Sequence, residues 1–167
     1  MLLLLTRPVV WSAILLWLLL AVALCRPVAA RFRLAPWPTL GALLSAAVIG
    51  VVTLTPDGWY GLRDPGSCLR VTAAELHSAG LHLLSGPQQL FNVLLFVPLG
   101  FFLVLTTGRF RWSAVTVLVL PVLIEVAQAT FARRVCAVLD WFDNTLGGLI
   151  GAAVGVVALA VLRRAVD

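Results

Sequence analysis

Five long apolar runs constrain this chain more than any other feature of its sequence. They cover residues 9–25, 38–55, 90–107, 113–131 and 146–162. Each has the length that a helix needs to cross the hydrocarbon core of a bilayer, about 17–25 residues. The composition agrees, because 62% of the 167 residues are hydrophobic, 11% are charged and the mean hydropathy is +1.07. We therefore predict an all-α fold: a polytopic membrane helical bundle of about five transmembrane helices, forming a single integral membrane domain over residues 1–167.

The charged residues exclude one function class and indicate an orientation. All twelve basic residues are arginine and they lie scattered between the apolar runs, so the chain lacks the clustered basic face that binds nucleic acid. If the connections alternate across five spans, one side holds seven arginines and the other five: Arg26, Arg31, Arg33, Arg109, Arg111, Arg163 and Arg164 against Arg7, Arg63, Arg70, Arg133 and Arg134. Arginine-rich loops stay in the cytoplasm. We therefore expect the N-terminus outside and the C-terminus in the cytoplasm.

The longest connection between apolar runs covers residues 56–89 and is expected on the outer side. Within it, Thr72 and Glu75 have the spacing of a capping box. Apolar residues then recur at helical spacing up to the Ser-Gly-Pro stop at 85–87. The sequence therefore predicts a short interfacial helix lying on the outer membrane surface.

No residue pattern indicates a metal or a cofactor. His77 and His82 are five positions apart, which is not the spacing of a zinc-binding helix. The three cysteines, Cys25, Cys68 and Cys136, form no C-x-x-C pair and cannot all form disulfides with one another. We expect none of these residues to hold a metal ion.

Polar side chains inside or beside the apolar runs indicate a site, because an ionisable group at membrane depth is costly and usually functional. Glu125 lies inside the fourth run, and Gln128 follows it on the same helical face. Pro121, one turn before Glu125, is expected to kink that helix and free a backbone carbonyl. We predict a polar cluster near the outer face formed by Asn92, Glu125, Gln128, Arg134, Asp140 and Asn144. The alternative is that these groups make ordinary hydrogen bonds between helices.

Within this cluster Arg134 is the expected partner of Glu125. The connection after the fourth run is expected to bring Arg134, Asp140 and Asn144 back over the end of that helix. A bidentate guanidinium contact cannot be reproduced by lysine. By contrast, we expect Arg133→Lys and Asp143→Asn to be tolerated.

The last apolar run has a glycine face. Gly147, Gly151 and Gly155 recur every four residues, and small residues at this spacing let a second helix approach closely. We expect this face to pack against the helix that carries Glu125 or the helix that carries Asn92.

Together these positions resemble the VanZ-like family of bacterial membrane proteins, which is named for an accessory protein of glycopeptide (teicoplanin-type) resistance. The resemblance covers about residues 40–162. It rests on the segments 92–100 (NVLLFVPLG), 125–128 (EVAQ) and 144–147 (NTLG), with Thr55-Pro56, Arg134, Asp140 and Gly151. It implies a multi-pass protein of the bacterial plasma membrane, with an outward-facing polar pocket that acts on or shields envelope components.

Three functions stay open at this level. In the first, the protein is a non-catalytic factor whose partners are membrane lipids and a lipid-linked envelope precursor or a glycopeptide, with Arg134 contacting a phosphate. In the second, it is an intramembrane enzyme with Glu125 as general acid or base. In the third, it is a small transporter, although the sequence lacks the internal repeats typical of that class. The first is favoured, because no activated nucleophile, metal-ligand spacing or phosphate-binding loop accompanies Glu125.

Overall fold

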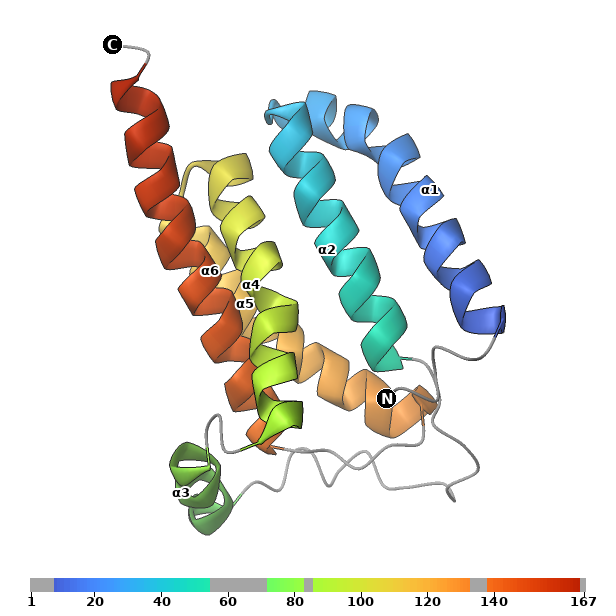
Figure 1. Ribbon diagram of the computed structural model, residues 1–167, viewed down its shortest axis with the longest axis vertical. Helices are drawn as coiled ribbons and strands as arrows, with labels where there is room; N and C mark the ends of the chain where they lie inside the picture. Colours follow the sequence, from blue (N-terminus) through green and yellow to red (C-terminus); the bar gives the residue numbers. More distant parts are fainter. Residues whose placement is uncertain (1–7, 55–71, 83–85, 133–137, 166–167) are drawn as a thin grey trace.

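The computed structural model describes residues 8–54, 72–82, 86–132 and 138–165, and these residues form helices joined by turns (Figure 1). The elements in chain order are α1 (Pro8–Phe32), α2 (Pro36–Leu54), α3 (Ala73–Leu81), α4 (Pro87–Thr107), α5 (Phe110–Ala127), the π-helix η3 (Gln128–Ala132) and α6 (Val138–Arg164). Five of the described helices, α1, α2, α4, α5 and α6, are long and apolar enough to cross a membrane. The prediction of an all-α bundle with five spans and a shorter helix is confirmed.

The long helices form a hairpin of α1 and α2 and a group of α4, α5 and α6. The two parts meet where α2 packs against α4. Helices α1 and α2 run antiparallel, α1 lies at the edge, and α2 packs on α4 (Figure 1). Helix α5 crosses behind α4 and ends, through η3, beneath the C-terminal end of α2. A core cluster of Ile49, Phe96, Leu99 and Ile124 joins α2, α4 and α5. Because lipid surrounds the bundle, most of the remaining apolar side chains are exposed.

Helices α4 and α6 make the most extensive contact in the bundle, and small residues form it. The glycine face of α6 meets one face of α4, with Gly147 at Val93, Gly151 at Val97 and Gly155 at Phe101. A Cβ on any of the three would lie under 3.0 Å from a backbone atom of α4. The glycines therefore set how closely these two helices approach, and α4, which carries Asn92, is their partner.

Two tight turns join the long helices, and each uses a residue in the left-handed region. After α1, Arg33 has φ 55°, and the next N–H, that of Leu34, donates to the carbonyl of Ala29 at 2.8 Å. This pattern is a Schellman cap, which usually has glycine at the left-handed position. After α4, Gly108 has φ 65° and its N–H donates to the carbonyl of Val104 at 2.8 Å.

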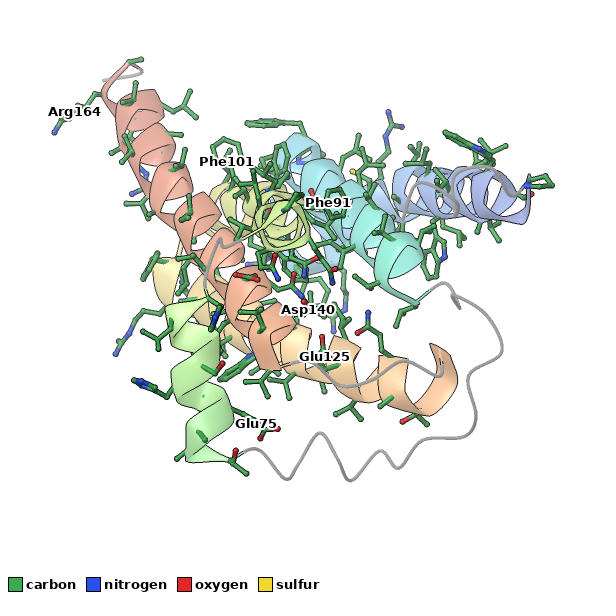
Figure 2. All side chains as sticks on the ribbon, turned by 60° about the horizontal axis from the view of Figure 1, so that its bottom comes forward. Glu75, Phe91, Phe101, Glu125, Asp140 and Arg164 are labelled. Atoms are coloured by element: carbon green, nitrogen blue, oxygen red, sulfur yellow. The ribbon has the colours of Figure 1, made fainter. Side chains whose placement is uncertain are left out.

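The capping box predicted at the start of α3 is present. The backbone N–H of Thr72 donates to the Glu75 carboxylate at 2.7 Å, and the N–H of Glu75 donates to Thr72 Oγ1 at 3.2 Å. These hydrogen bonds to Thr72 lower the pKa of Glu75 below its ordinary value of 4.5. Helix α3 packs against α6, and Glu75 lies on its outer side (Figure 2).

Two helix boundaries differ from those expected. Helix α6 begins at residue 138 rather than 146, so Asp140 and Asn144 lie in its first turns and not in a connection. Their four-residue spacing places both side chains on the same face of α6, which faces the bundle interior. There they contact protein instead of lipid. A helix start predicted from apolar residues alone therefore falls too late. Helix α1 continues to Phe32 and includes Arg26 and Arg31, whose long side chains reach out of the apolar layer.

Candidate functional site

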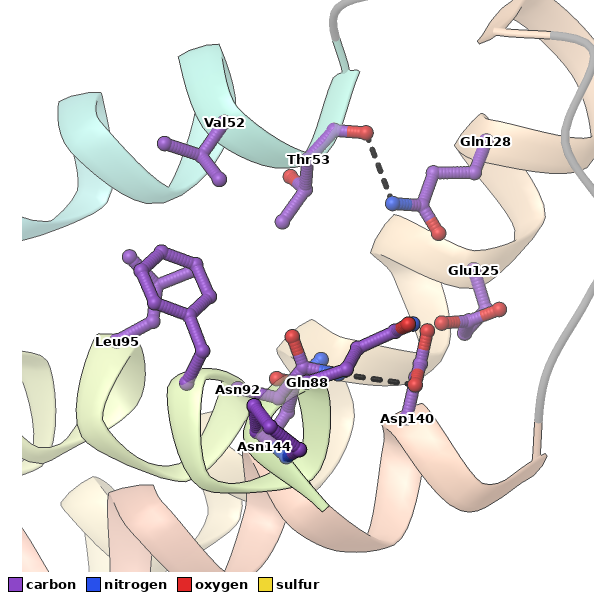
Figure 3. A pocket seen from close by; sticks show the side chains of 11 residues that line it. Val52, Thr53, Gln88, Asn92, Leu95, Glu125, Gln128, Asp140 and Asn144 are labelled. Atoms are coloured by element: carbon purple, nitrogen blue, oxygen red, sulfur yellow. Dashed lines mark hydrogen bonds between the residues drawn. The ribbon is translucent and has the colours of Figure 1, made fainter. Parts of the chain in front are cut away.

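A cavity of about 330 Å³ lies at the end of the bundle where α4 and α6 begin and where α2 and α5 end (Figure 3). One part of its wall is polar and another is apolar. The lining residues are Val52 and Thr53 from α2, Pro87, Gln88, Phe91, Asn92 and Leu95 from α4, Glu125 from α5, Gln128 from η3, and Asp140 and Asn144 from α6. Four long helices thus contribute to one site.

A hydrogen bond between α4 and α6 fixes one side of the cavity. Asn92 Nδ2 donates to Asp140 Oδ1 at 2.9 Å (Figure 3). Asn92 directly precedes Val93, which contacts Gly147, and Asp140 lies about two turns before that glycine. The close approach of the two helices therefore brings the amide and the carboxylate within bonding distance.

A second hydrogen bond fixes the opposite side. Gln128 Nε2 donates to the backbone carbonyl of Thr53 at 2.8 Å, although the residues are 75 positions apart. Gln128 is the first residue of η3, and it is buried. A single π-helical turn shifts the residues after it around the helix axis and is frequent at functional sites. Here the π-helical turn η3 directly follows α5 and lies beneath the C-terminal end of α2.

Pro121 explains how α5 is held against α6 below the cavity. A proline has no N–H to donate to the carbonyl four residues earlier, which is that of Val117. Thr145 Oγ1 from α6 donates to this carbonyl at 3.4 Å, and Trp141 Nε1 donates to the next one, that of Leu118, at 3.3 Å. In a membrane, freed backbone groups must find such partners within the protein. The carbonyl that Pro121 leaves without a helix bond is thus that of Val117, two turns before Glu125, and whether Pro121 kinks α5 stays a prediction.

Two carboxyl groups face each other across the polar wall. The side chains of Glu125 and Asp140 point toward one another, and the Gln88 amide points toward both (Figure 3). Glu125 is buried, with 4% of its surface exposed, whereas Asp140 is half-buried. Figure 2 places the two acids at the same end of the bundle, far from Arg164. An ionisable group at this depth of a spanning helix makes Glu125 a candidate functional residue.

Asn144 contributes an unusual group to the wall. Only 3% of its surface is exposed, and its side-chain oxygen Oδ1 has no hydrogen-bond partner among the described residues. Leaving a buried polar atom unpaired costs about 1–3 kcal/mol. Asn144 therefore carries a polar atom whose cost the described contacts do not offset.

The structure brings together five of the six predicted cluster residues. Asn92, Glu125, Gln128, Asp140 and Asn144 all line the cavity. The sixth, Arg134, lies outside the described residues, as do Arg133, Cys68, Cys136 and Thr55-Pro56 of the sequence resemblance.

Sequence reasoning missed several wall residues. Gln88 lies one turn before Asn92 on the same face of α4, and that spacing could have identified it. Thr53 contributes a backbone carbonyl, which no side-chain pattern reveals. Asp143 is fully buried, with 0% exposed. The expectation that Asp143→Asn is tolerated stays a prediction, because asparagine has nearly the same shape as aspartate and the change removes only the charge.

The described residues hold no group of three or more metal-ligand side chains. His77 and His82 are exposed on α3, where a ring nitrogen of His82 contacts the Ser78 carbonyl at 2.8 Å. Cys25 is buried, and its thiol donates to the carbonyl of Pro36 at 3.0 Å, which links the two ends of the α1–α2 turn.

The VanZ/LLP1 family model matches residues 60–160. The chain belongs to the VanZ/LLP1 family. The resemblance read from the sequence is thereby confirmed. The matched region contains α3, α4, α5, η3 and most of α6, and so every wall residue of the cavity except Val52 and Thr53. No curated protein and no solved structure matches the chain.

Proposed function

We propose that this VanZ/LLP1 protein is a non-catalytic membrane factor of the bacterial cell envelope. In this proposal it binds the polar head group of a lipid-linked envelope component in the cavity between α2, α4, α5 and α6. The observation that carries the proposal is the buried polar wall of the cavity at the ends of the spanning helices, with the unpaired oxygen of Asn144 in it. Teicoplanin-type glycopeptide resistance would follow from shielding such a component.

The shape and lining of the cavity favour an amphiphile. Val52, Phe91 and Leu95 form an apolar part of the wall beside the amides and carboxylates. A volume of about 330 Å³ lies at the lower end of the range for small-molecule sites, about 300–1,000 Å³. It suits one head group and is too small for a whole glycopeptide antibiotic. The envelope component is therefore the better ligand.

The distribution of charge supports an outward-facing cavity. Among the described residues, the acids lie at the cavity end: Glu75, Glu125, Asp140 and Asp143. The described arginines are exposed and lie toward the opposite end: Arg26, Arg31, Arg33, Arg109, Arg111, Arg163 and Arg164. The positive-inside rule assigns the arginine end to the cytoplasm. We therefore propose that the C-terminus is cytoplasmic, that the N-terminus is outside and that the cavity opens toward the outer leaflet.

A second candidate is an intramembrane enzyme that acts on an envelope lipid. The facing carboxyl groups of Glu125 and Asp140 favour it, because a pair of acids in different surroundings is typical of general acid and base catalysis. The described wall offers no serine, cysteine or histidine as a nucleophile, and the Thr53 hydroxyl already donates to the Ile49 carbonyl at 2.7 Å. Binding therefore explains more of the wall than catalysis does.

Complementation of a deletion strain tests the proposal, with glycopeptide sensitivity or envelope stress as the readout. We expect Asn144→Ala and Glu125→Gln to lose complementation while the protein level in the membrane fraction is unchanged. Thr116→Val is the matched control, because Thr116 is an exposed polar residue of α5 that bonds only the Trp112 carbonyl. Full complementation by both wall variants would refute the proposed function.

Lipid analysis separates the two candidates. Mass spectrometry of extracts from strains with and without the protein would show a converted lipid if the protein is an enzyme. A binding factor leaves the set of lipid species unchanged.

A further inference from the structure

The end of the bundle opposite the cavity forms a second charged surface. It comprises the turn between α1 and α2, the turn between α4 and α5, and the end of α6, all at the upper end in Figure 1. In the sequence, these segments (residues 26–35, 108–111 and 163–167) contain seven arginines and one acid, Asp167, which lies outside the described residues. One carboxylate offsets the charge of one arginine, so this end keeps a positive excess.

Arginines from two elements come together at the turn between α4 and α5. Arg163 reaches over from the end of α6, and its Nη2 lies 3.7 Å from the position that a Cβ on Gly108 would occupy. Because Gly108 has no side chain, the guanidinium lies directly against the turn. Arg109 is the next residue, and its side chain is exposed. Arg111 adds a third exposed arginine in the first turn of α5.

Side-chain hydroxyl groups hold the backbone of Arg109 in place. Its N–H donates to Thr107 Oγ1 at 3.2 Å, and its carbonyl accepts from the hydroxyl and the backbone N–H of Ser113 at 3.2 and 3.4 Å. In the described part of the chain, the guanidinium groups of Arg109 and Arg163 form no hydrogen bond or salt bridge. A fixed turn with available guanidinium groups is suited to bind an anion, because little ordering is needed on binding.

Aromatic side chains place this turn at the level of the lipid head groups. Trp112 in the first turn of α5 and Trp37 in the first turn of α2 are both exposed. Tryptophan at the ends of spanning helices is typical of the boundary between the hydrocarbon and the head groups. Below Trp112, α5 exposes Val115 and Val119, which offer an apolar surface to acyl chains. An anion at this turn therefore fits the phosphate of a lipid.

We propose that the turn between α4 and α5 binds an anionic phospholipid, whose phosphate lies between Arg109 and Arg163. Guanidinium groups bind phosphate oxygens through paired hydrogen bonds, and basic pockets between spanning helices hold anionic head groups. The bound lipid joins the end of α6 to the turn and so stabilises the contact between α4 and α6 at the end opposite the cavity. The proposal does not depend on the ligand of the cavity, and it applies to whichever leaflet the arginine end faces.

Two phospholipids with the same acyl chains and different head groups test the proposal. The full chain in dodecyl maltoside is titrated with dioleoyl phosphatidylglycerol, which is anionic, or dioleoyl phosphatidylcholine, which has no net charge, and the midpoint of thermal unfolding is measured. At ten times the dissociation constant a bound ligand raises the midpoint by about 3–6 °C for a chain of this size. We expect a saturable rise with phosphatidylglycerol alone. Glycerol phosphate, which lacks acyl chains, should give none.

Arginine variants show whether the response comes from this turn. Arg109→Gln and Arg163→Gln should each raise the phosphatidylglycerol concentration at half-maximal rise about fivefold, the contribution of one basic residue beside an anionic head group. Arg26→Gln is the matched control, because Arg26 is exposed at the same end but lies on α1 at the edge of the bundle. It should change that concentration less than twofold. All three side chains are exposed, so the variants should fold normally without lipid.

Tryptophan fluorescence gives a second measurement that does not depend on stability. In vesicles, brominated acyl chains quench tryptophans that they contact, and the difference between the chain and its Trp112→Phe variant isolates the signal of Trp112. At equal mole fraction, brominated phosphatidylglycerol should quench Trp112 at least twofold more than brominated phosphatidylcholine. Combining Arg109→Gln with Arg163→Gln should remove this preference.

Four results would overturn the proposal. Equal rises with both phospholipids would show that the anionic head group is not recognised. An equal rise with glycerol phosphate would identify a site for a free phosphate. Equal weakening by Arg26→Gln would mean that diffuse surface charge, and not a site at the turn, attracts the lipid. If neither phospholipid moves the midpoint, the quenching decides, and equal quenching of Trp112 by the two brominated lipids refutes the proposal.

Discussion

The contact between α4 and α6 makes Gly151 the most informative position for a stability measurement. A Cβ on Gly151 would lie under 3.0 Å from the carbonyl of Val97, whereas ordinary van der Waals contact is 3.4–4 Å. The neighbour is helix backbone, which cannot rotate away as a flexible side chain does. Gly151→Ala therefore forces α4 and α6 apart and also loosens the contacts of Gly147 and Gly155.

The size and sign of the effect follow from two opposing terms. Overpacking costs about 1–3 kcal/mol, and this site belongs at the upper end because the whole helix must shift. Alanine is favoured over glycine within a helix by about 1 kcal/mol. The net loss is therefore about 2 kcal/mol. For a chain of this size that loss lowers the unfolding midpoint by about 4–8 °C, and Gly151→Leu should lower it further.

The sequence offers a matched control in another spanning helix. Gly50 of α2 has no atom within 4 Å of the position that a Cβ would occupy. Gly50→Ala should leave the midpoint unchanged or raise it by about 2–4 °C, because only the helix preference acts. Val157, which is 64% exposed on α6, should accept leucine without loss.

The assay is the thermal midpoint of detergent-solubilised protein, followed by size-exclusion chromatography of heated samples. The folded yield of each variant is measured before heating. If Gly151→Ala unfolds at the same temperature as Gly50→Ala, or above the unmodified protein, the glycines do not hold the helices at their closest approach and the argument is wrong.

Four further predictions concern single residues. Asn144→Leu removes a buried unpaired oxygen, so the protein should unfold at an equal or higher temperature and yet fail to complement. Arg33→Gly relieves the left-handed backbone at φ 55°, and because such strain costs about 1 kcal/mol, the unfolding midpoint should rise by about 2–4 °C. The capping bonds to Thr72 lower the pKa of Glu75, so the ionised carboxylate stabilises α3 fully above pH 4.5 and this effect is lost as the pH falls through the lowered pKa. Hydrogen exchange of the α3 amides should therefore be faster in acid than at neutral pH. In Glu75→Ala the exchange rates should no longer differ between the two pH values for this reason. In a chain without native cysteines, His77→Cys should react with an impermeant thiol reagent in intact cells, and Arg164→Cys only after permeabilisation; the reverse pattern would invert the proposed orientation.

Much of the site could be predicted from the sequence, because a polar residue within a long apolar run is easily recognised. Glu125 and Gln128 stand out against an apolar helix, and an ionisable group in that setting has few roles. Asn92 and Asn144 were identified in the same way, as polar residues inside or beside apolar runs. The glycine spacing indicated a close helix contact, although the partner helix was left between two candidates.

The hydrogen bonds of the site were not accessible in the same way. The Thr53 carbonyl is identical to any other backbone carbonyl in the sequence, and only the position of η3 beneath α2 makes it the acceptor of Gln128. The bond from Thr145 to Val117 likewise depends on how α5 crosses α6. Such pairings join residues far apart along the chain, so no local pattern encodes them.

The sequence by itself determined the spans, because a bilayer requires each crossing segment to be apolar and to satisfy its own backbone, and both are local properties. It also determined which side chains are too polar to face lipid. Only the tertiary structure decided that Asn92 meets Asp140, that Phe91 and Gln88 join the wall, and that α6 begins early enough to carry two polar residues inward. The physical reason is that these contacts depend on the distance and angle between helices, which the packing of α6 glycines on the α4 backbone sets.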